Sequence, residues 1–142
     1  MAGLSPTQRT LAALREQGMN ATVAEKWVSF HSDDNDHSRK KKKPTGIRVD
    51  FFGIIDVVGL TPETTLGVQC CAGSGYSAHW HKLTEENAKN TKDWLACPSR
   101  KLEIYAWRKV KLKRGGKAMR WSARIVEIVL TDNGFEAVTK VD

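Results

Sequence analysis

The chain is poor in the residues that cross-link small secreted proteins. It has three cysteines, an odd number, and two of them, Cys70 and Cys71, are adjacent. Neighbouring residues of a strand point to opposite faces, so these two thiols are poorly placed to form a disulfide with each other. We therefore expect reduced thiols and a cytoplasmic protein.

Long hydrophobic runs are also missing. No apolar stretch approaches the roughly 20 residues that a membrane span needs. The N-terminus lacks the basic and then apolar stretches of a secretory signal. We expect neither membrane association nor export. Hydrophobic residues still make up 40% of the 142 residues, which predicts one domain with a packed core over residues 1–142.

Acidic residues are scarce where basic residues gather. The net charge is +7, and 16 of the 23 Lys and Arg residues fall in two windows. The first window is residues 39–48, and the second is residues 100–124, in which Glu103 is the single acid. Such clustering creates a positive field that suits phosphates. Nucleic acid is the expected partner, DNA before RNA, and a basic surface that only aids solubility is the alternative.

Helix and strand signals alternate along the chain. Ser5 and Gln8 form a capping-box pattern around Pro6, which predicts a helix over residues 6–17. Other helical segments are expected over residues 77–82 and 84–96. Strands are expected over residues 21–30, 49–60, 65–72, 102–110 and 119–130. The order α-β-β-β-α-β-β predicts an α/β (α+β) domain with a mixed central sheet of about five strands flanked by helices. The mixed charge of residues 31–47 predicts a mobile loop.

One acidic side chain interrupts an apolar strand. Asp56 lies late in the segment 49–60, where a carboxylate must be paired, hydrogen-bonded or bound to a metal ion. Gln69, thirteen positions later, and Cys71 share one face of the next strand. Mg²⁺ or Mn²⁺ held by Asp56 and Gln69 would neutralise a phosphate and activate water. The alternative is that Asp56 only accepts hydrogen bonds from the backbone at the end of the sheet.

Asp50 is a further but weaker candidate for a metal ligand. It has the same parity as Asp56, yet six residues of extended strand would separate the two by roughly 20 Å. Both can hold one ion only if Gly53 bends the strand.

Short motifs follow one another in a recognisable order along residues 5–128. They are Glu25-Lys26-Trp27, Asp50-Phe51-Phe52-Gly53-Ile54-Ile55-Asp56, Gly67-Val68-Gln69, Gly73-Ser74 and Ala106-Trp107-Arg108. Together with the order of helices and strands, they resemble the PD-(D/E)XK nuclease superfamily, whose restriction-endonuclease-like fold includes Holliday-junction resolvases. The chain also looks like small uncharacterised proteins of phages and bacteria.

The resemblance implies a Mg²⁺-dependent endonuclease that hydrolyses phosphodiester bonds in branched or junction DNA, encoded by a phage or bacterium and active in the host cell. Asp56 matches the metal-binding aspartate of the superfamily, Gln69 its second acid and Cys71 its lysine. A neutral amide binds metal more weakly than a carboxylate, and a thiol brings no fixed positive charge to a phosphate. Other residues would therefore have to complete the site.

Three charged residues could compensate for these departures. Glu25 would supply a carboxylate, and Lys26 or Lys82 would supply the positive charge. The residues expected to bind nucleic acid lie mainly in the two basic windows and after the third strand: Arg39, Lys40, Lys41, Lys42, Lys43, Arg48, Ser74, His79, His81, Arg108, Lys109, Lys111, Lys113 and Arg114.

Two other functions fit the same residues. A non-catalytic nucleic-acid-binding protein on a nuclease-derived fold explains the basic windows together with the changed acid and lysine. An interaction protein that forms a homodimer through an aromatic and apolar sheet edge is compatible with either reading. Metal-dependent cleavage that Asp56→Asn abolishes would separate the nuclease from the binding protein.

Overall fold

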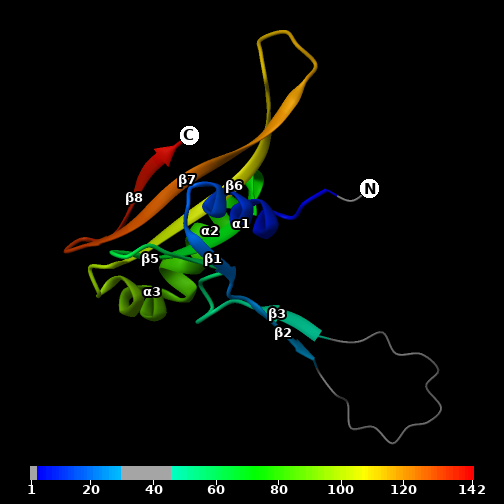
Figure 1. The fold of residues 1–142 in the computed structure, drawn as a ribbon. Helices are drawn as coiled ribbons and strands as arrows, with labels where there is room; N and C mark the ends of the chain where they lie inside the picture. Colours follow the sequence, from blue (N-terminus) through cyan, green and yellow to red (C-terminus); the bar gives the residue numbers. More distant parts are fainter. Residues whose placement is uncertain (1–2, 30–45) are drawn as a thin grey trace, which may run out of the picture.

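The computed structural model describes residues 3–29 and 46–142 (Figure 1). A six-stranded sheet with the order β1-β4-β5-β6-β7-β8 lies at its centre, and β2 and β3 form a separate two-stranded sheet. The helical elements are α1 (Pro6–Glu16), the 3-10 turn η1 (Gly73–Gly75), α2 (Tyr76–His81), the π-helical turn η2 (Lys82–Glu86) and α3 (Ala88–Leu95). The strands are β1 (Asn20–Val23), β2 (Lys26–Ser29), β3 (Gly46–Val49), β4 (Val57–Leu60), β5 (Thr65–Ala72), β6 (Arg100–Lys111), β7 (Met119–Thr131) and β8 (Gly134–Val141).

This architecture confirms the mixed α/β class and the mixed central sheet. Once the β2–β3 hairpin is set aside, the elements run α1-β1-β4-β5-α2-α3-β6-β7, which is the expected order, and then β8. β1, β4 and β5 are antiparallel, whereas β5 and β6 are parallel, joined by the crossover that contains α2 and α3. The sequence prediction lacks β8, because six of its eight residues are exposed and leave no buried stripe.

Elements with a strong local pattern form where they are expected. The Ser5 hydroxyl accepts a hydrogen bond from the Gln8 backbone N–H at 3.2 Å, and Gln8 Oε1 accepts one from the Ser5 N–H at 2.9 Å. This capping box starts α1, as predicted. β5, β6 and β7 also agree with the expected strands to within two residues at each end.

The strand expected over residues 21–30 is wrong, because the chain breaks between β1 and β2. The backbone N–H groups of Ala24 and Glu25 donate to the carbonyl oxygen of Asp56, at distances of 2.8 and 3.3 Å. This contact ends the pairing of β1 with β4. β2 then pairs with β3 in the second sheet, although Phe30 lies outside the described residues.

The single strand expected over residues 49–60 is also wrong, because a tight turn divides it into β3 and β4. Phe52 and Gly53 adopt positive φ angles of 54° and 74° at this turn. Apolar composition correctly indicates burial of the segment, with Ile54 and Ile55 fully buried. Composition alone does not report the reversal of the backbone.

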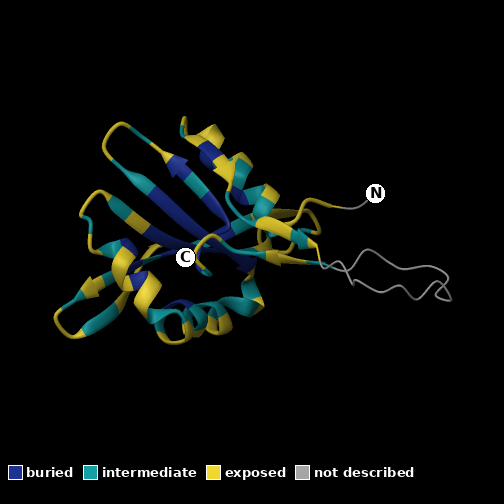
Figure 2. Ribbon diagram, turned by 90° about the horizontal axis from the view of Figure 1, so that it is seen from below, coloured by how far each residue is buried: buried dark blue, intermediate teal, exposed yellow. Residues whose placement is uncertain are grey.

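Apolar side chains cover the two faces of the main sheet in separate layers. On one face, Leu14 of α1 packs against Val57 and Val68. On the other face, Leu83 and Trp94 from the helical crossover join a second cluster. Figure 2 shows the buried residues concentrated in the strands of the central sheet. Over residues 3–29 and 46–142, no helix has the length and apolar character to cross a membrane.

Candidate metal centre

The turn between β3 and β4 brings two acidic residues together. The backbone N–H of Phe51 donates to the Ile55 carbonyl oxygen at 2.8 Å, and the N–H of Gly53 donates to the Asp50 carbonyl oxygen at 3.0 Å. Asp50 and Asp56 therefore lie at the two ends of a closed turn rather than six extended residues apart. The chain thus bends at Gly53, as it must if Asp50 and Asp56 are to hold one ion.

Gly53 is needed for this turn. A Cβ atom added to it would lie 2.9 Å from Oδ1 of Asn87, at a φ angle of +74°. We expect Gly53→Ala to lower the free energy of unfolding by about 2–3 kcal/mol, because backbone strain and a clash add together. Gly115→Ala is the control, since Gly115 has a φ of +78° but open space around it; it should cost about 1 kcal/mol. Urea denaturation measures both losses, and equal values would contradict the importance of the Asn87 contact.

A third acid joins the pair because the break between β1 and β2 lies against Asp56. One carboxylate oxygen from each of Glu25, Asp50 and Asp56 lies within 4.8 Å of the other two. Glu25 Oε1 also accepts a hydrogen bond from Nη1 of Arg48 on β3, at 2.8 Å. The Glu25 side chain is 9% exposed and that of Arg48 is 69% exposed, so the guanidinium lies on the solvent side of this ion pair. We call Glu25, Asp50 and Asp56 the acidic cluster.

The surroundings of the acidic cluster favour the protonated form of Asp56. Asp56 is 5% exposed, and its Oδ2 accepts a hydrogen bond from the Cys70 backbone N–H at 2.8 Å. Burial, a hydrogen bond with Asp50 and the negative charges nearby raise the pKa of Asp56 to about 8. Burial opposes ionisation of Asp50 too, but hydrogen bonds from Asp56, Lys82 and Gln69 outweigh it and lower the pKa of Asp50. A cation bound between these oxygens would replace that proton.

Gln69 lies beside the acidic cluster as a fully buried bridge. Its Nε2 donates to the Ile54 carbonyl oxygen at 2.9 Å and to Oδ2 of Asp50 at 3.2 Å. Its Oε1 accepts hydrogen bonds from Nζ of Lys82 at 3.0 Å and from Nδ1 of His79 at 2.7 Å. A carbonyl oxygen can only accept, so the amide nitrogen must face Ile54. This orientation argues against the metal-ligand role expected for Gln69, because the atom nearest Asp50 is a donor.

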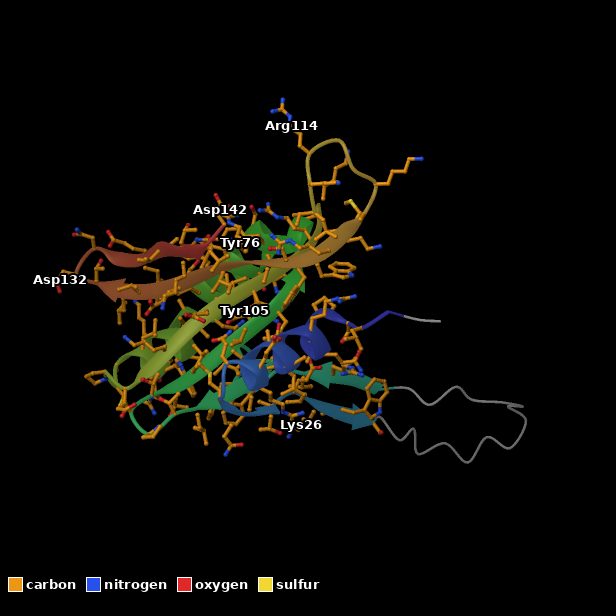
Figure 3. The ribbon with its side chains drawn as sticks, turned by 45° about the horizontal axis from the view of Figure 1, so that its top comes forward. Lys26, Tyr76, Tyr105, Arg114, Asp132 and Asp142 are labelled. Atoms are coloured by element: carbon orange, nitrogen blue, oxygen red, sulfur yellow. The ribbon has the colours of Figure 1, made fainter. Side chains whose placement is uncertain are left out.

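Of the two candidate lysines, Lys82 contacts the cluster. It comes from η2, forms an ion pair with Asp50 and donates to Gln69. Lys26 is exposed on β2, at the edge of a hollow of about 400 Å³ that Asp50 also lines. Among the hydrogen bonds and ion pairs of the described residues, none links Lys26 to the acids. Figure 3 shows Lys26 on the β2–β3 hairpin.

Cys71 cannot supply the positive charge of the lysine that the resemblance implies at its position. It is buried in the apolar cluster beneath α2, together with Ile55 and Leu83. Burial and the charge of Asp56 raise the pKa of its thiol to about 11, so the group stays neutral at physiological pH.

The residues expected to bind nucleic acid do not gather at one place. His79 lies at the acidic cluster, where burial and the charge of Lys82 lower its pKa, whereas His81 turns to Glu85 at 2.7 Å. Ser74, Arg108 and Lys109 line one hollow at the end of β5. Lys111 ends β6, and Figure 3 shows Arg114 at the tip of the β6–β7 hairpin, near Lys113 in sequence. Arg39, Lys40, Lys41, Lys42 and Lys43 lie outside the described residues, as does the expected loop from residue 31 to residue 45. The loop prediction is wrong for residues 46 and 47, because they pair with β2 as part of β3.

Sequence reasoning missed residues that contribute to the surroundings of these sites. Arg9 of α1 stacks on Trp121 of β7, with its guanidinium carbon 3.8 Å from the ring centroid. Asn87 lies against Gly53. No spacing along the chain indicates either contact, because each joins residues that are remote in sequence.

Comparison with models of protein families, with curated proteins and with solved structures finds no match for this chain. The family resemblance therefore rests on the motifs quoted above and stays a prediction.

Proposed function

We propose that this protein is a metal-dependent DNA endonuclease that hydrolyses phosphodiester bonds, with branched or junction DNA as its substrate. The observation that carries the proposal is the acidic cluster, in which three carboxylates converge and one of them, that of the buried Asp56, has a raised pKa. Perturbed carboxylates of this kind are concentrated at functional sites. The order α1-β1-β4-β5-α2-α3-β6 is consistent with the restriction-endonuclease-like core implied by the sequence motifs.

The residues of the cluster suit a hard divalent cation. Mg²⁺ and Mn²⁺ prefer carboxylate oxygens, and Glu25, Asp50 and Asp56 offer three of them. Such an ion would supply charge neutralisation for the phosphate and a more acidic bound water. In this proposal, Lys82 takes the part of the lysine replaced by Cys71 and neutralises charge on the phosphate. Gln69 holds Lys82 and Asp50 in position from the protein interior.

The test is cleavage of supercoiled plasmid and of a synthetic four-way junction in the presence of Mg²⁺ or Mn²⁺. We expect Lys82→Met to reduce the cleavage rate by about 10²–10³-fold, since a preorganised charge at the reacting phosphate is lost. Lys92→Met is the matched control, because Lys92 is exposed on α3, and it should cleave like the wild type. If the folded wild type cleaves neither substrate with either metal, the nuclease proposal fails and the non-catalytic nucleic-acid-binding protein takes its place.

Metal binding should release a proton. Because the pKa of Asp56 is about 8, most of the metal-free protein carries this proton at pH 7, and a bound cation requires its loss. We expect metal affinity to fall about tenfold for each pH unit below 8 and to level off above it. Calorimetry with Mn²⁺ in buffers of different ionisation enthalpy should give about one proton released at pH 7. Binding without proton release would contradict the protonation assigned to Asp56.

A further inference from the structure

A groove of cationic and aromatic side chains opens at the end of β5, beyond the acidic cluster. It has a volume of about 470 Å³ and lies between η1 and the β6–β7 hairpin. Six of its lining residues are polar, charged or aromatic: Ser74, Trp107, Arg108, Lys109, Trp121 and Arg124. None of the lining residues is acidic. We call this hollow the cation–aromatic groove.

The positive charge of the groove is uncompensated. Within residues 3–29 and 46–142, Arg108, Lys109 and Arg124 form no ion pair with an acid, whereas Lys101 and Lys140 elsewhere on the sheet do. The Nε atom of Arg124 is buried and has no hydrogen-bond partner among the described residues, although a buried donor normally has one. The lining of the groove carries positive charge without negative charge, which a phosphate supplies.

The two tryptophans of the groove lie with Lys109 on the face of the sheet that α1 covers, whereas Arg108 and Arg124 lie on the opposite face. Trp121 is 40% exposed, with Arg9 stacked on its ring and Nζ of Lys109 5.4 Å from its centroid. The Arg124 guanidinium lies 4.2 Å from the Tyr76 centroid. Trp107 is held in place by its indole N–H, which donates to Thr10 at 2.9 Å. Grooves that combine backbone-tracking cations with rings for base stacking bind single strands.

The groove and the acidic cluster lie at the same end of the sheet. Glu25 follows β1 and Asp56 precedes β4, so both lie at the end where β5 finishes. The strand register places Arg124 opposite Ala106 and Ala106 opposite Cys71. Two inter-strand spacings, roughly 10 Å, thus separate Arg124 from the strand that carries Gln69. A bound strand could pass from the groove to the cluster within a few nucleotides.

We propose that the cation–aromatic groove binds an unpaired nucleic-acid strand. One base stacks on Trp121 in place of the Arg9 guanidinium, with a backbone phosphate on Lys109 of the same face. The strand then crosses the edge of β6 beyond the end of β5, so that further phosphates contact Arg108 and Arg124 on the opposite face. The consequence for the substrate rests on the proposed function: the DNA that the nuclease cleaves carries a single-stranded segment next to the cleaved bond. A duplex would place its bases out of reach of Trp121 and would use only the charges.

The experiment measures binding in EDTA, so that it does not depend on metal or cleavage. Fluorescence anisotropy of a labelled 20-nucleotide DNA strand is compared with that of the duplex of the same sequence. We expect the wild type to bind the single strand about tenfold more tightly than the duplex, and Trp121→Ala to lose about tenfold on the single strand with little change on the duplex. Trp121→Phe should restore most of the loss. Arg124→Met should make the salt dependence of single-strand binding shallower by about 0.7.

Trp27→Ala is the matched control, because Trp27 is 55% exposed on β2, outside the groove, and should bind like the wild type. Equal affinity for single strand and duplex, or equal losses for the two alanine variants, would overturn the proposal. Binding of the RNA strand of the same sequence shows whether the sugar affects affinity. Binding of either DNA or RNA single strands supports the proposal for the groove. Failure of the protein to cleave DNA would contradict the nuclease proposal alone. Failure of this binding test would contradict the groove proposal and leave the nuclease proposal unaffected.

Discussion

Replacing Asp56 with asparagine should make the metal-free protein more stable at neutral pH and remove its response to metal. Asparagine reproduces the protonated side chain: its oxygen can accept from the Cys70 N–H, and its amide nitrogen can donate to Asp50. In the wild type, the pKa of Asp56 rises from 3.8 to about 8 on folding. The unfolded state therefore loses this proton first, and the free energy of unfolding falls as the pH rises from 3.8 toward 8.

The asparagine variant lacks this pH-dependent loss. The stability gap between Asp56→Asn and the wild type should be close to zero near pH 4, grow up to about pH 8 and stay constant above it. At pH 8 we expect a gap on the order of 2–4 kcal/mol, since each pKa unit corresponds to about 1.4 kcal/mol and solvent relaxation reduces the total. Urea denaturation across this pH range measures the gap.

Metal should stabilise the wild type and have no effect on the asparagine variant. We expect millimolar Mn²⁺ to raise the melting temperature of the wild type and leave that of Asp56→Asn unchanged, with cleavage reduced by about 10³-fold or more. Asp132→Asn is the control, because Asp132 is exposed in the turn between β7 and β8, and it should match the wild type throughout. A variant that keeps its metal response would show that Asp56 does not hold the ion. A variant that is less stable than the wild type at pH 8 would show that Asp56 does not hold the proton.

Gln69→Glu should destabilise the protein strongly, although glutamate is the residue type that the superfamily pattern favours at this position. The new carboxylate would face the Ile54 carbonyl oxygen and Oδ2 of Asp50, both of which now accept from the amide nitrogen. Lys82 is already shared with Asp50 and can offset only part of the added charge. We expect the free energy of unfolding to fall by about 2–4 kcal/mol at pH 8 without metal.

The same variant distinguishes two roles for Gln69. If Gln69 positions Lys82 and Asp50, Gln69→Glu loses stability, and Gln69→Met also loses cleavage while the acidic cluster still binds Mn²⁺. If Gln69 is itself a ligand, Gln69→Glu should bind Mn²⁺ more tightly and keep its stability. Gln17→Glu is the control for adding a charge at an exposed position. Urea denaturation and Mn²⁺ calorimetry on the three variants decide between the two roles.

Helices and strands with strong local signals could be predicted from the sequence. The capping box at Ser5 specifies where α1 begins, and alternation of apolar residues specifies β6 and β7. The sequence also singled out Asp56, because an acid in an apolar segment needs a partner wherever the segment folds. These inferences hold because they depend on neighbours within a few residues of the chain.

Which side chains meet could not be predicted from the sequence, because it depends on how the elements pack. Glu25, Asp50 and Asp56 converge because one strand breaks and another reverses at Gly53, and both events are hidden within runs of apolar residues. Lys82, and not Lys26, contacts the cluster because η2 brings it to Asp50 and to Gln69 of β5. The periodicity of a sequence reports which face a side chain occupies. It does not report the path that the backbone takes between faces, and that path brings distant charges to within bonding distance.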